Sequence, residues 1–114
     1  KETLMNDILK ELALILDERK RSADTDSSYV ASLHQQGLNR ILEKVGEEAA
    51  ETIIAAKDVQ SGGSRDALVS EVADLWFHSM VMLSHLDIRL DEVSTCLAGR
   101  LGVSGLDEKA GRRQ

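Results

Sequence analysis

The sequence predicts an all-helical protein, and three observations support that fold class. The chain has no proline and only three aromatic residues, Tyr29, Trp76 and Phe77, so it is poor in the residues that favour the turns and strand faces of β proteins. Apolar side chains recur at spacings of three and four residues along most of the chain, which is the pattern of helices with one buried face. With 114 residues, 42% of them apolar, the chain is long enough for one domain with a single core.

The N-terminal third of the chain predicts a long helix, a loop and a short helix. Apolar residues at helical spacing extend over about residues 4–21, and the basic residues that end this segment suit the negative end of a helix dipole. The segment Ser22–Ser28 is rich in side chains that compete for backbone hydrogen bonds, so we expect a loop there. A short helical turn should then begin at Tyr29 and end near Gly37.

The middle of the chain predicts a helical hairpin. Apolar positions continue without a break over residues 38–58, which indicates a long second helix. The stretch Ser61–Ser64 reads Ser-Gly-Gly-Ser, and its last serine is suited to cap a third helix over about residues 65–86. Two long helices joined by so short a turn should pack antiparallel.

Beyond the hairpin the apolar spacing of Leu90–Leu101 predicts a fourth, shorter helix. From residue 102 the chain carries glycines among charged residues, which is typical of a flexible tail. We therefore expect one all-α domain over residues 1–101 and a flexible C-terminal tail over residues 102–114.

The expected architecture is a four-helix-type bundle built on the central antiparallel hairpin and completed by dimerisation. The third helix is apolar on nearly all sides, so it requires more than one partner. We expect Phe77 and Val81 to be exposed on the side away from the hairpin, and Ile54 to be exposed on the second helix. An apolar patch of this kind predicts a homodimer or a higher homo-oligomer. Trp76 and Cys96 are expected to be buried in the core.

The charge balance and the cysteine content limit the partners and the compartment. The chain carries 20 acidic and 14 basic side chains, a formal net charge of −6, which is the wrong sign for binding nucleic acid through its phosphates. The single cysteine cannot form an internal disulfide, and no apolar run reaches the length of a membrane helix. With no signal-peptide pattern at Lys1–Glu11 either, we expect a cytoplasmic protein without a nucleic-acid or membrane partner.

Acidic residues are concentrated beside the buried stripe of the second helix. On a helical wheel centred on Val45, the side chains of Lys44, Glu48 and Glu51 share one flank of the stripe, and Glu47 lies one step further toward solvent. Like charges three and four residues apart destabilise a helix by a few tenths of a kcal/mol per pair. A sequence selected for stability alone therefore has reason to avoid this arrangement.

The third helix carries a matching acidic edge. Glu71, Asp74 and His78 lie side by side on the flank of its apolar stripe, so antiparallel packing would bring the acids of both helices together. Converging carboxylates offer hard oxygen ligands, which favours Mg²⁺ or Mn²⁺ over zinc or a di-iron centre. The alternative is that these acids form only a solvated helix face.

The motifs around these acids resemble a known family. They read Ser28-Tyr29, then Gly37-Leu38-x-x-Ile41-Leu42-x-Lys44-Val45-Gly46-Glu47-Glu48-Ala49-x-Glu51 and Ala55-Ala56-Lys57-Asp58, then Glu71-x-Ala73-Asp74-Leu75-x-x-His78. Over about residues 4–101 the chain resembles the phosphoribosyl-ATP pyrophosphohydrolases, within the all-α nucleoside triphosphate pyrophosphohydrolases that also include the MazG-like enzymes. It departs from the family pattern at Val30, where threonine is usual, at Asp87, near a turn where glycine is usual, and in the missing prolines of the loop before the motif.

The resemblance implies an activity and a cofactor. The activity is hydrolysis of the α–β phosphoanhydride of phosphoribosyl-ATP to phosphoribosyl-AMP and pyrophosphate, the second step of histidine biosynthesis. Four carboxylates would hold Mg²⁺, or Mn²⁺ in its place, against the phosphate oxygens: Glu48, Glu51, Glu71 and Asp74. Glu47 would hold or deprotonate the attacking water, or would lie outside the ligand set. The number of ions and the attacked phosphorus stay open.

The remaining candidate residues each have a structural alternative. Lys44 is placed to contact phosphate oxygens, or to form a salt bridge with the acids one turn along its helix. Arg19 and Lys20 are candidate phosphate contacts, although their position also suits the C-terminus of a helix. His78 is interpreted as a hydrogen-bond partner of a metal ligand, because histidine is an unusual ligand of Mg²⁺.

Three other functions fit parts of the pattern. A MazG-like dNTP pyrophosphatase would share every metal ligand and differ in its substrate pocket. A helical interaction module would leave the acids solvated and would not bind Mg²⁺. A phosphorelay domain would need an exposed, phosphorylatable His78, and the neighbouring acids oppose a phosphoryl group there.

Overall fold

The computed structural model describes residues 4–102, and within this range all regular secondary structure is helical. The helices in chain order are α1 (Leu4–Lys20), α2 (Tyr29–Gln36), α3 (Leu38–Gln60), α4 (Arg65–His85) and α5 (Leu90–Leu101). The all-α prediction is confirmed, and each predicted helix lies within about two residues of its expected bounds. The expected flexible tail falls outside the described residues, apart from Gly102, which follows α5.

Local hydrogen bonds explain where the middle helices begin. The Ser28 hydroxyl accepts a hydrogen bond from the Ala31 N–H at 3.1 Å and starts α2. Ser64 does the same for the Ala67 N–H at 3.1 Å and starts α4, as the sequence predicts. Between α2 and α3 the single residue Gly37 has φ of +100°, a backbone conformation that glycine adopts without steric cost.

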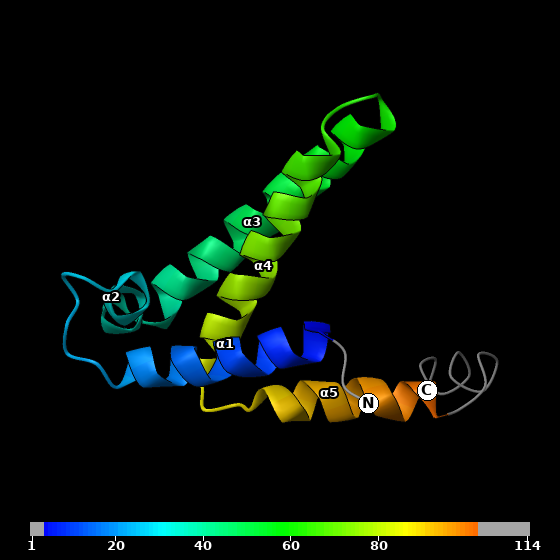
Figure 1. Ribbon diagram of the computed structural model, residues 1–114. Helices are drawn as coiled ribbons and strands as arrows, with labels where there is room; N and C mark the ends of the chain where they lie inside the picture. The colour runs from blue at the N-terminus through cyan, green and yellow to red at the C-terminus, as the bar shows by residue number, and fades with distance from the viewer. Residues whose placement is uncertain (1–3, 103–114) are drawn as a thin grey trace.

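The hairpin of α3 and α4 forms the longest part of the molecule, and its two helices run side by side and antiparallel (Figure 1). Its turn is tight, because the Gly63 N–H donates to the Asp58 carbonyl at 2.7 Å. A Cβ atom at Gly63 would lie only 2.7 Å from that same oxygen, so a side chain there would force the turn apart. The turn end of the hairpin projects away from α1 and α2 (Figure 1).

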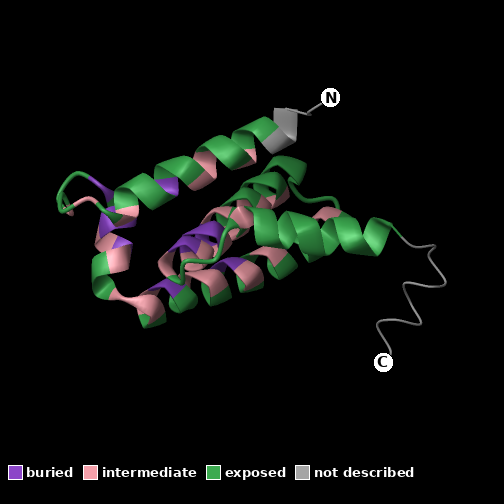
Figure 2. Cartoon of the chain, turned by 90° about the horizontal axis from the view of Figure 1, so that it is seen from below, coloured by how far each residue is buried: buried purple, intermediate pink, exposed green. Residues whose placement is uncertain are grey.

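The core lies at the opposite end of the hairpin, where α1 crosses α4 and α2 packs between α1 and α3. Figure 2 shows buried segments gathered where these helices meet, whereas α5 is exposed beyond its first residue, Leu90. The buried cluster consists of Leu16, Val30, Leu33, Ile41, Met80 and Val81. Burial of each such side chain stabilises the fold by about 1.5–3 kcal/mol, so α1 and α2 hold the hairpin from this end.

The C-terminal end of α4 is held by a lysine from α1. The Lys20 ammonium donates to the Ser84 carbonyl at 2.7 Å and to the His85 carbonyl at 3.3 Å. It also forms an ion pair with Asp87 at 2.6 Å. The last carbonyls of a helix lack partners within the helix and carry partial negative charge, so Lys20 caps α4 from another element.

The expected exposure of several apolar residues is wrong. Val81 is fully buried and Phe77 is half-buried against the core. The reason is that α1 covers the side of α4 for which the sequence predicts no partner within the chain. Trp76 is 44% exposed and Cys96 is exposed, so neither belongs to the core of this chain. Ile54 is exposed on α3 as expected.

No helix within residues 4–102 is both long enough and apolar enough to cross a membrane.

Candidate metal centre

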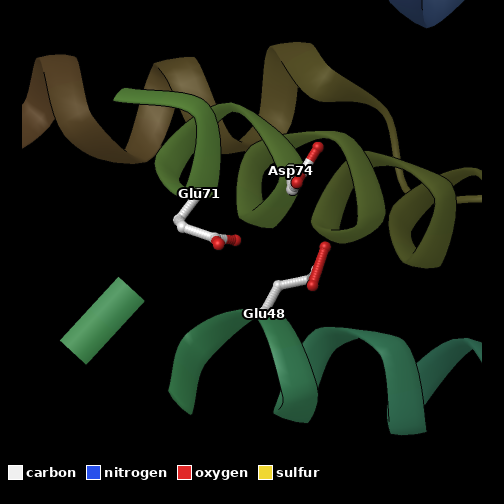
Figure 3. A group of neighbouring side chains, drawn as sticks. All are labelled: Glu48, Glu71 and Asp74. Carbon is white, nitrogen blue, oxygen red and sulfur yellow. The ribbon is translucent and has the colours of Figure 1, made fainter. Parts of the chain in front are cut away.

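Three carboxylates meet between the two helices of the hairpin. Glu48 projects from α3, and Glu71 and Asp74 project from α4 to face it (Figure 3). One oxygen from each of the three side chains lies within 4.8 Å of the other two. The two acidic edges predicted from the helical wheels therefore do come together, because the antiparallel packing aligns residue 48 with the turn of α4 that carries residues 71 and 74.

Burial and like charge shift the proton affinity of this group. Glu48 is 6% exposed, and burial, together with the neighbouring carboxylates of Glu51 and Asp74, raises the pKa of Glu48 to about 7. Partial burial and the same two neighbours also raise the pKa of Glu71. Carboxyl groups that resist losing their protons mark a place where negative charge is crowded and a cation would be stabilised.

Glu51 and Glu47, the other two acids predicted for the site, lie outside the close group of three carboxylates. Glu51 is exposed at the edge of the cluster, where its charge raises the pKa of both Glu48 and Glu71, but it is not part of the close group of three. Glu47 points to solvent, as the wheel predicts, and pairs with Lys44 one turn earlier.

Lys44 adopts the structural alternative that the sequence leaves open. Its ammonium donates to Glu47 at 3.1 Å, and this hydrogen bond raises the pKa of Lys44. Glu48 and the Tyr29 hydroxyl also contribute to that shift, so the ammonium lies at the rim of the acidic cluster. An exposed pair of this kind contributes at most about 1 kcal/mol, which leaves Lys44 able to exchange Glu47 for another anion.

The structure does not bring Arg19 and Lys20 to the cluster. Lys20 is engaged at the C-terminal end of α4, three helical turns from Asp74 at about 3.6 residues per turn, and Arg19 is an exposed neighbour on α1. A depression of about 450 Å³ also lies at that end, between α1, α4 and the start of α5, and none of its lining residues belongs to the acidic cluster.

His78 lies behind the carboxylates and contacts Tyr29, a residue that the sequence analysis did not assign to the site. Its Nε2 lies 2.8 Å from the Tyr29 hydroxyl oxygen. Its Nδ1 lies 3.0 Å from the Asp74 carbonyl oxygen and 3.8 Å from Oε1 of Glu48. The tyrosine stands in the Ser-Tyr pair of the family motif, but no spacing rule connects it to a histidine two helices later.

The donor set suits a hard divalent cation. Glu48, Glu71 and Asp74 offer only carboxylate oxygens, and in residues 4–102 no cysteine or histidine belongs to the close group. Mg²⁺ and Mn²⁺ prefer such ligands, and the raised pKa values of the two glutamates indicate charge that a cation would offset. Fold and site together define a class: all-helical proteins in which a helical hairpin presents a carboxylate cluster that could hold a divalent cation.

Within that class the chain belongs to the phosphoribosyl-ATP pyrophosphohydrolase family, whose model matches residues 9–100. The match includes the whole hairpin, the acidic cluster and α2. The protein is therefore a hydrolase that acts on a phosphoanhydride, and the family is in general metal-dependent. This agrees with the resemblance seen in the motifs of the sequence.

Proposed function

We propose that this protein hydrolyses phosphoribosyl-ATP to phosphoribosyl-AMP and pyrophosphate in the second step of histidine biosynthesis, with Mg²⁺ as its cofactor and Mn²⁺ as a substitute. The observation that supports this proposal is the convergence of Glu48, Glu71 and Asp74 from the two hairpin helices in a chain of this family. Surface acids selected for solubility would spread apart, whereas these three crowd against the buried stripe.

In this proposal the carboxylates of the cluster hold the cation. Glu48, Glu71 and Asp74 would hold the cation, and Glu51 would complete the set from the edge of the cluster. A divalent cation supplies positive charge that offsets the phosphate oxygens and makes a nearby water more acidic. The crowding that raises the pKa of Glu48 in the free protein is relieved when the charge of the cation is present.

Two further residues would act on the substrate and on water. Glu47 is the carboxylate that would orient or deprotonate the attacking water, because it lies one helix position from Glu48 and is accessible to solvent. Its partner Lys44 would turn from Glu47 to the phosphate oxygens when substrate binds. The Lys44–Glu47 pair is exposed and costs little to separate.

We also propose that the chain assembles as a homodimer. Val69, Ala73 and Trp76 form an exposed stripe at helical spacing on α4, and Ile53 and Ile54 are exposed on α3. Four of these side chains are large apolar groups with 44–67% of their surface exposed. A second copy of the hairpin would remove this apolar surface from water.

The direct test is a substrate panel with product analysis. The purified protein is incubated with phosphoribosyl-ATP or with each dNTP, with and without Mg²⁺, and pyrophosphate is measured against orthophosphate. We expect Mg²⁺-dependent release of pyrophosphate from phosphoribosyl-ATP and loss of at least about 100-fold in activity in Glu71→Gln. The matched control Glu43→Gln removes an exposed acid of α3 that pairs with Arg40 and should retain activity.

The panel also separates the alternatives. Pyrophosphate released mainly from dNTPs would assign the site to a MazG-like pyrophosphatase. Release of orthophosphate would contradict cleavage between the α and β phosphates. No Mg²⁺-dependent product from any substrate would leave the acids as a solvated face and would overturn the proposal.

A further inference from the structure

The contact between Tyr29 and His78 joins α2 to the hairpin beside the acidic cluster. Tyr29 is the first residue of α2, and its hydroxyl oxygen lies 2.8 Å from Nε2 of His78. The two rings meet edge to face, with centroids 5.8 Å apart and planes at 89°. The His78 side chain is only 8% exposed, so its ring nitrogens must find partners within the protein.

The other side of the ring determines which nitrogen carries the proton. Nδ1 lies 3.0 Å from the Asp74 carbonyl oxygen, and a carbonyl oxygen can only accept a hydrogen bond. Nδ1 of His78 is therefore the donor. In the neutral ring Nε2 is then the acceptor, and the Tyr29 hydroxyl is the donor to it. The Asp74 carbonyl thus sets the tautomer, and the Tyr29 hydroxyl holds the plane of the ring through the other nitrogen.

This tautomer directs an N–H group at the carboxylate cluster. Oε1 of Glu48 lies 3.8 Å from Nδ1 of His78, which is too far for a hydrogen bond but close enough for the polar N–H to attract the carboxylate. The opposite tautomer would direct a lone pair at both oxygens and would repel them. The electrostatic attraction on the Glu48 carboxylate thus depends on how the His78 ring is held.

We propose that Tyr29 is a positioning residue for the cation site: its hydroxyl holds the plane of the His78 ring, and the Nδ1–H of that ring then stays directed toward the Glu48 carboxylate for cation binding. The inference rests on the proposed function only in taking the cluster as a cation site. It assigns a role to α2, which contributes no carboxylate, and it explains why the buried ring of His78 lies behind the ligands. Groups that hydrogen-bond to ligand side chains typically change metal affinity or activity by about 10–100-fold when mutated.

Tyr29 is well suited to a clean test. Tyr29 as a residue is 51% exposed, and α2 is anchored independently by Val30 and Leu33 in the core and by the Ser28 cap. Tyr29→Phe removes only the hydroxyl and keeps the ring contact. Ser28→Ala is the matched control, because it removes the cap and weakens α2 but keeps the Tyr29 hydroxyl.

The first measurement is ¹⁵N NMR of the His78 imidazole in the full chain, in the presence of chelator. The wild type should show protonated Nδ1 and unprotonated Nε2, with the Nε2 resonance shifted by its hydrogen bond to Tyr29. Tyr29→Phe should keep Nδ1 protonated but move and broaden the Nε2 resonance, because the ring is no longer held on that side. Ser28→Ala should lower the melting temperature without changing either resonance. A wild-type ring protonated at Nε2, or a spectrum that Tyr29→Phe does not change, would overturn the inference.

The second measurement is Mn²⁺ affinity, followed by paramagnetic resonance of the free ion. Tyr29→Phe should weaken Mn²⁺ binding by about 10-fold, and His78→Asn, whose amide can place an N–H at the Nδ1 position, should bind more tightly than His78→Gln. Tyr29→Phe should add no further loss in the His78→Asn background. Equal affinities in wild type and Tyr29→Phe would contradict the positioning role.

Failure of the inference and failure of the proposed function give different results. Tight Mn²⁺ binding that depends on Tyr29, without hydrolysis of phosphoribosyl-ATP, would refute the substrate and support the positioning role. Hydrolysis that is unchanged in Tyr29→Phe at limiting Mg²⁺ would support the function and refute the role of Tyr29. A wild-type chain that binds no Mn²⁺ would refute both.

Discussion

Glu48 combines burial with negative charge, and this combination has a cost in the metal-free protein. The residue is 6% exposed, and its carboxylate lies beside two other acids. Desolvation and like charge both oppose ionisation. The fold therefore holds the carboxylate in place at the expense of stability, as is common at functional sites.

We expect Glu48→Gln to be more stable than the wild type in chelator near neutral pH. The amide keeps the shape of the side chain and removes a charge that is both buried and crowded. The gain should be on the order of 1–2 kcal/mol, or a melting temperature about 5 °C higher. Glu51→Gln should give a smaller gain because Glu51 is exposed. Calorimetry with and without Mg²⁺ tests this, since added Mg²⁺ should stabilise only the wild type strongly; a Glu48→Gln chain that melts lower in chelator would contradict the crowding.

The same residue predicts a pH dependence. The pKa of Glu48 is about 7 in the folded protein and about 4.5 when unfolded, so its protonated form favours folding and that contribution is lost as the pH rises through 7. The difference in melting temperature between Glu48→Gln and wild type should be small near about pH 5 and should reach a plateau by about pH 8. Burial and His85 lower the pKa of His34, which affects both chains equally below about pH 6.5 and cancels in the difference. A difference independent of pH would show that Glu48 titrates normally.

At the scale of the helix, the end of α4 depends on a side chain from α1. Lys20 satisfies carbonyls that α4 itself cannot satisfy, and its ammonium lowers the pKa of Asp87 in the turn that follows. The basic end of α1 could be read from the sequence as a phosphate site or as a cap for its own helix. The structure shows a cap for a different helix.

Lys20→Met should therefore reduce stability and leave substrate binding unchanged. Methionine keeps the apolar stem and removes the charge and its hydrogen bonds, so we expect a loss of about 1 kcal/mol. Arg19→Met, at an exposed neighbouring position, should change stability by less than about 0.5 kcal/mol. Urea denaturation and the KM for phosphoribosyl-ATP are the measurements. An unchanged midpoint with a KM raised more than about tenfold would instead place Lys20 at the substrate.

The helices could be predicted from the sequence far better than their surroundings. Ser28, Gly37 and Ser64 mark helix ends through local chemistry, which a sequence reader can recognise. The acidic edges of the two hairpin helices could be predicted to meet, because each edge lies beside the apolar stripe of its helix. Burial of Val81 could not be foreseen, because it depends on which side of α4 is crossed by a helix some sixty residues earlier. The partner of Tyr29 was missed for the same reason.

At the scale of the molecule, α3 and α4 leave apolar surface uncovered along one face. α1 and α2 protect the end that contains Ile41 and Val81. The stripe with Val69 and Trp76 is exposed, so a single chain leaves part of its hairpin against water. Oligomerisation is the ordinary way in which a small protein covers such a face.

Substitutions on the two sides of α4 should affect different properties, assembly on the exposed side and folding on the buried side. Val69→Lys should weaken the proposed dimer while leaving helicity intact, because residue 69 is 67% exposed. Val81→Asp should unfold the chain, because it places a charge where the side chain is fully buried, at a cost above about 3 kcal/mol. Sedimentation velocity and circular dichroism distinguish the two. A wild type that sediments as a compact monomer at micromolar concentration would rule out this assembly.

Because α1 and α2 pack against only one end of the hairpin, local unfolding of α3 and α4 should become easier toward the other end. Amide hydrogens near Ile41 should exchange with solvent only on near-global unfolding, whereas those near Gly62 should exchange through local fraying. Glu48 lies between these ends, so a bound ion would join the two helices where the protective cover stops. When Mg²⁺ is added, the region of slow amide exchange should therefore extend along the hairpin toward Gly62. The bound ion would link α3 to α4 beyond the end at which the core already holds them together.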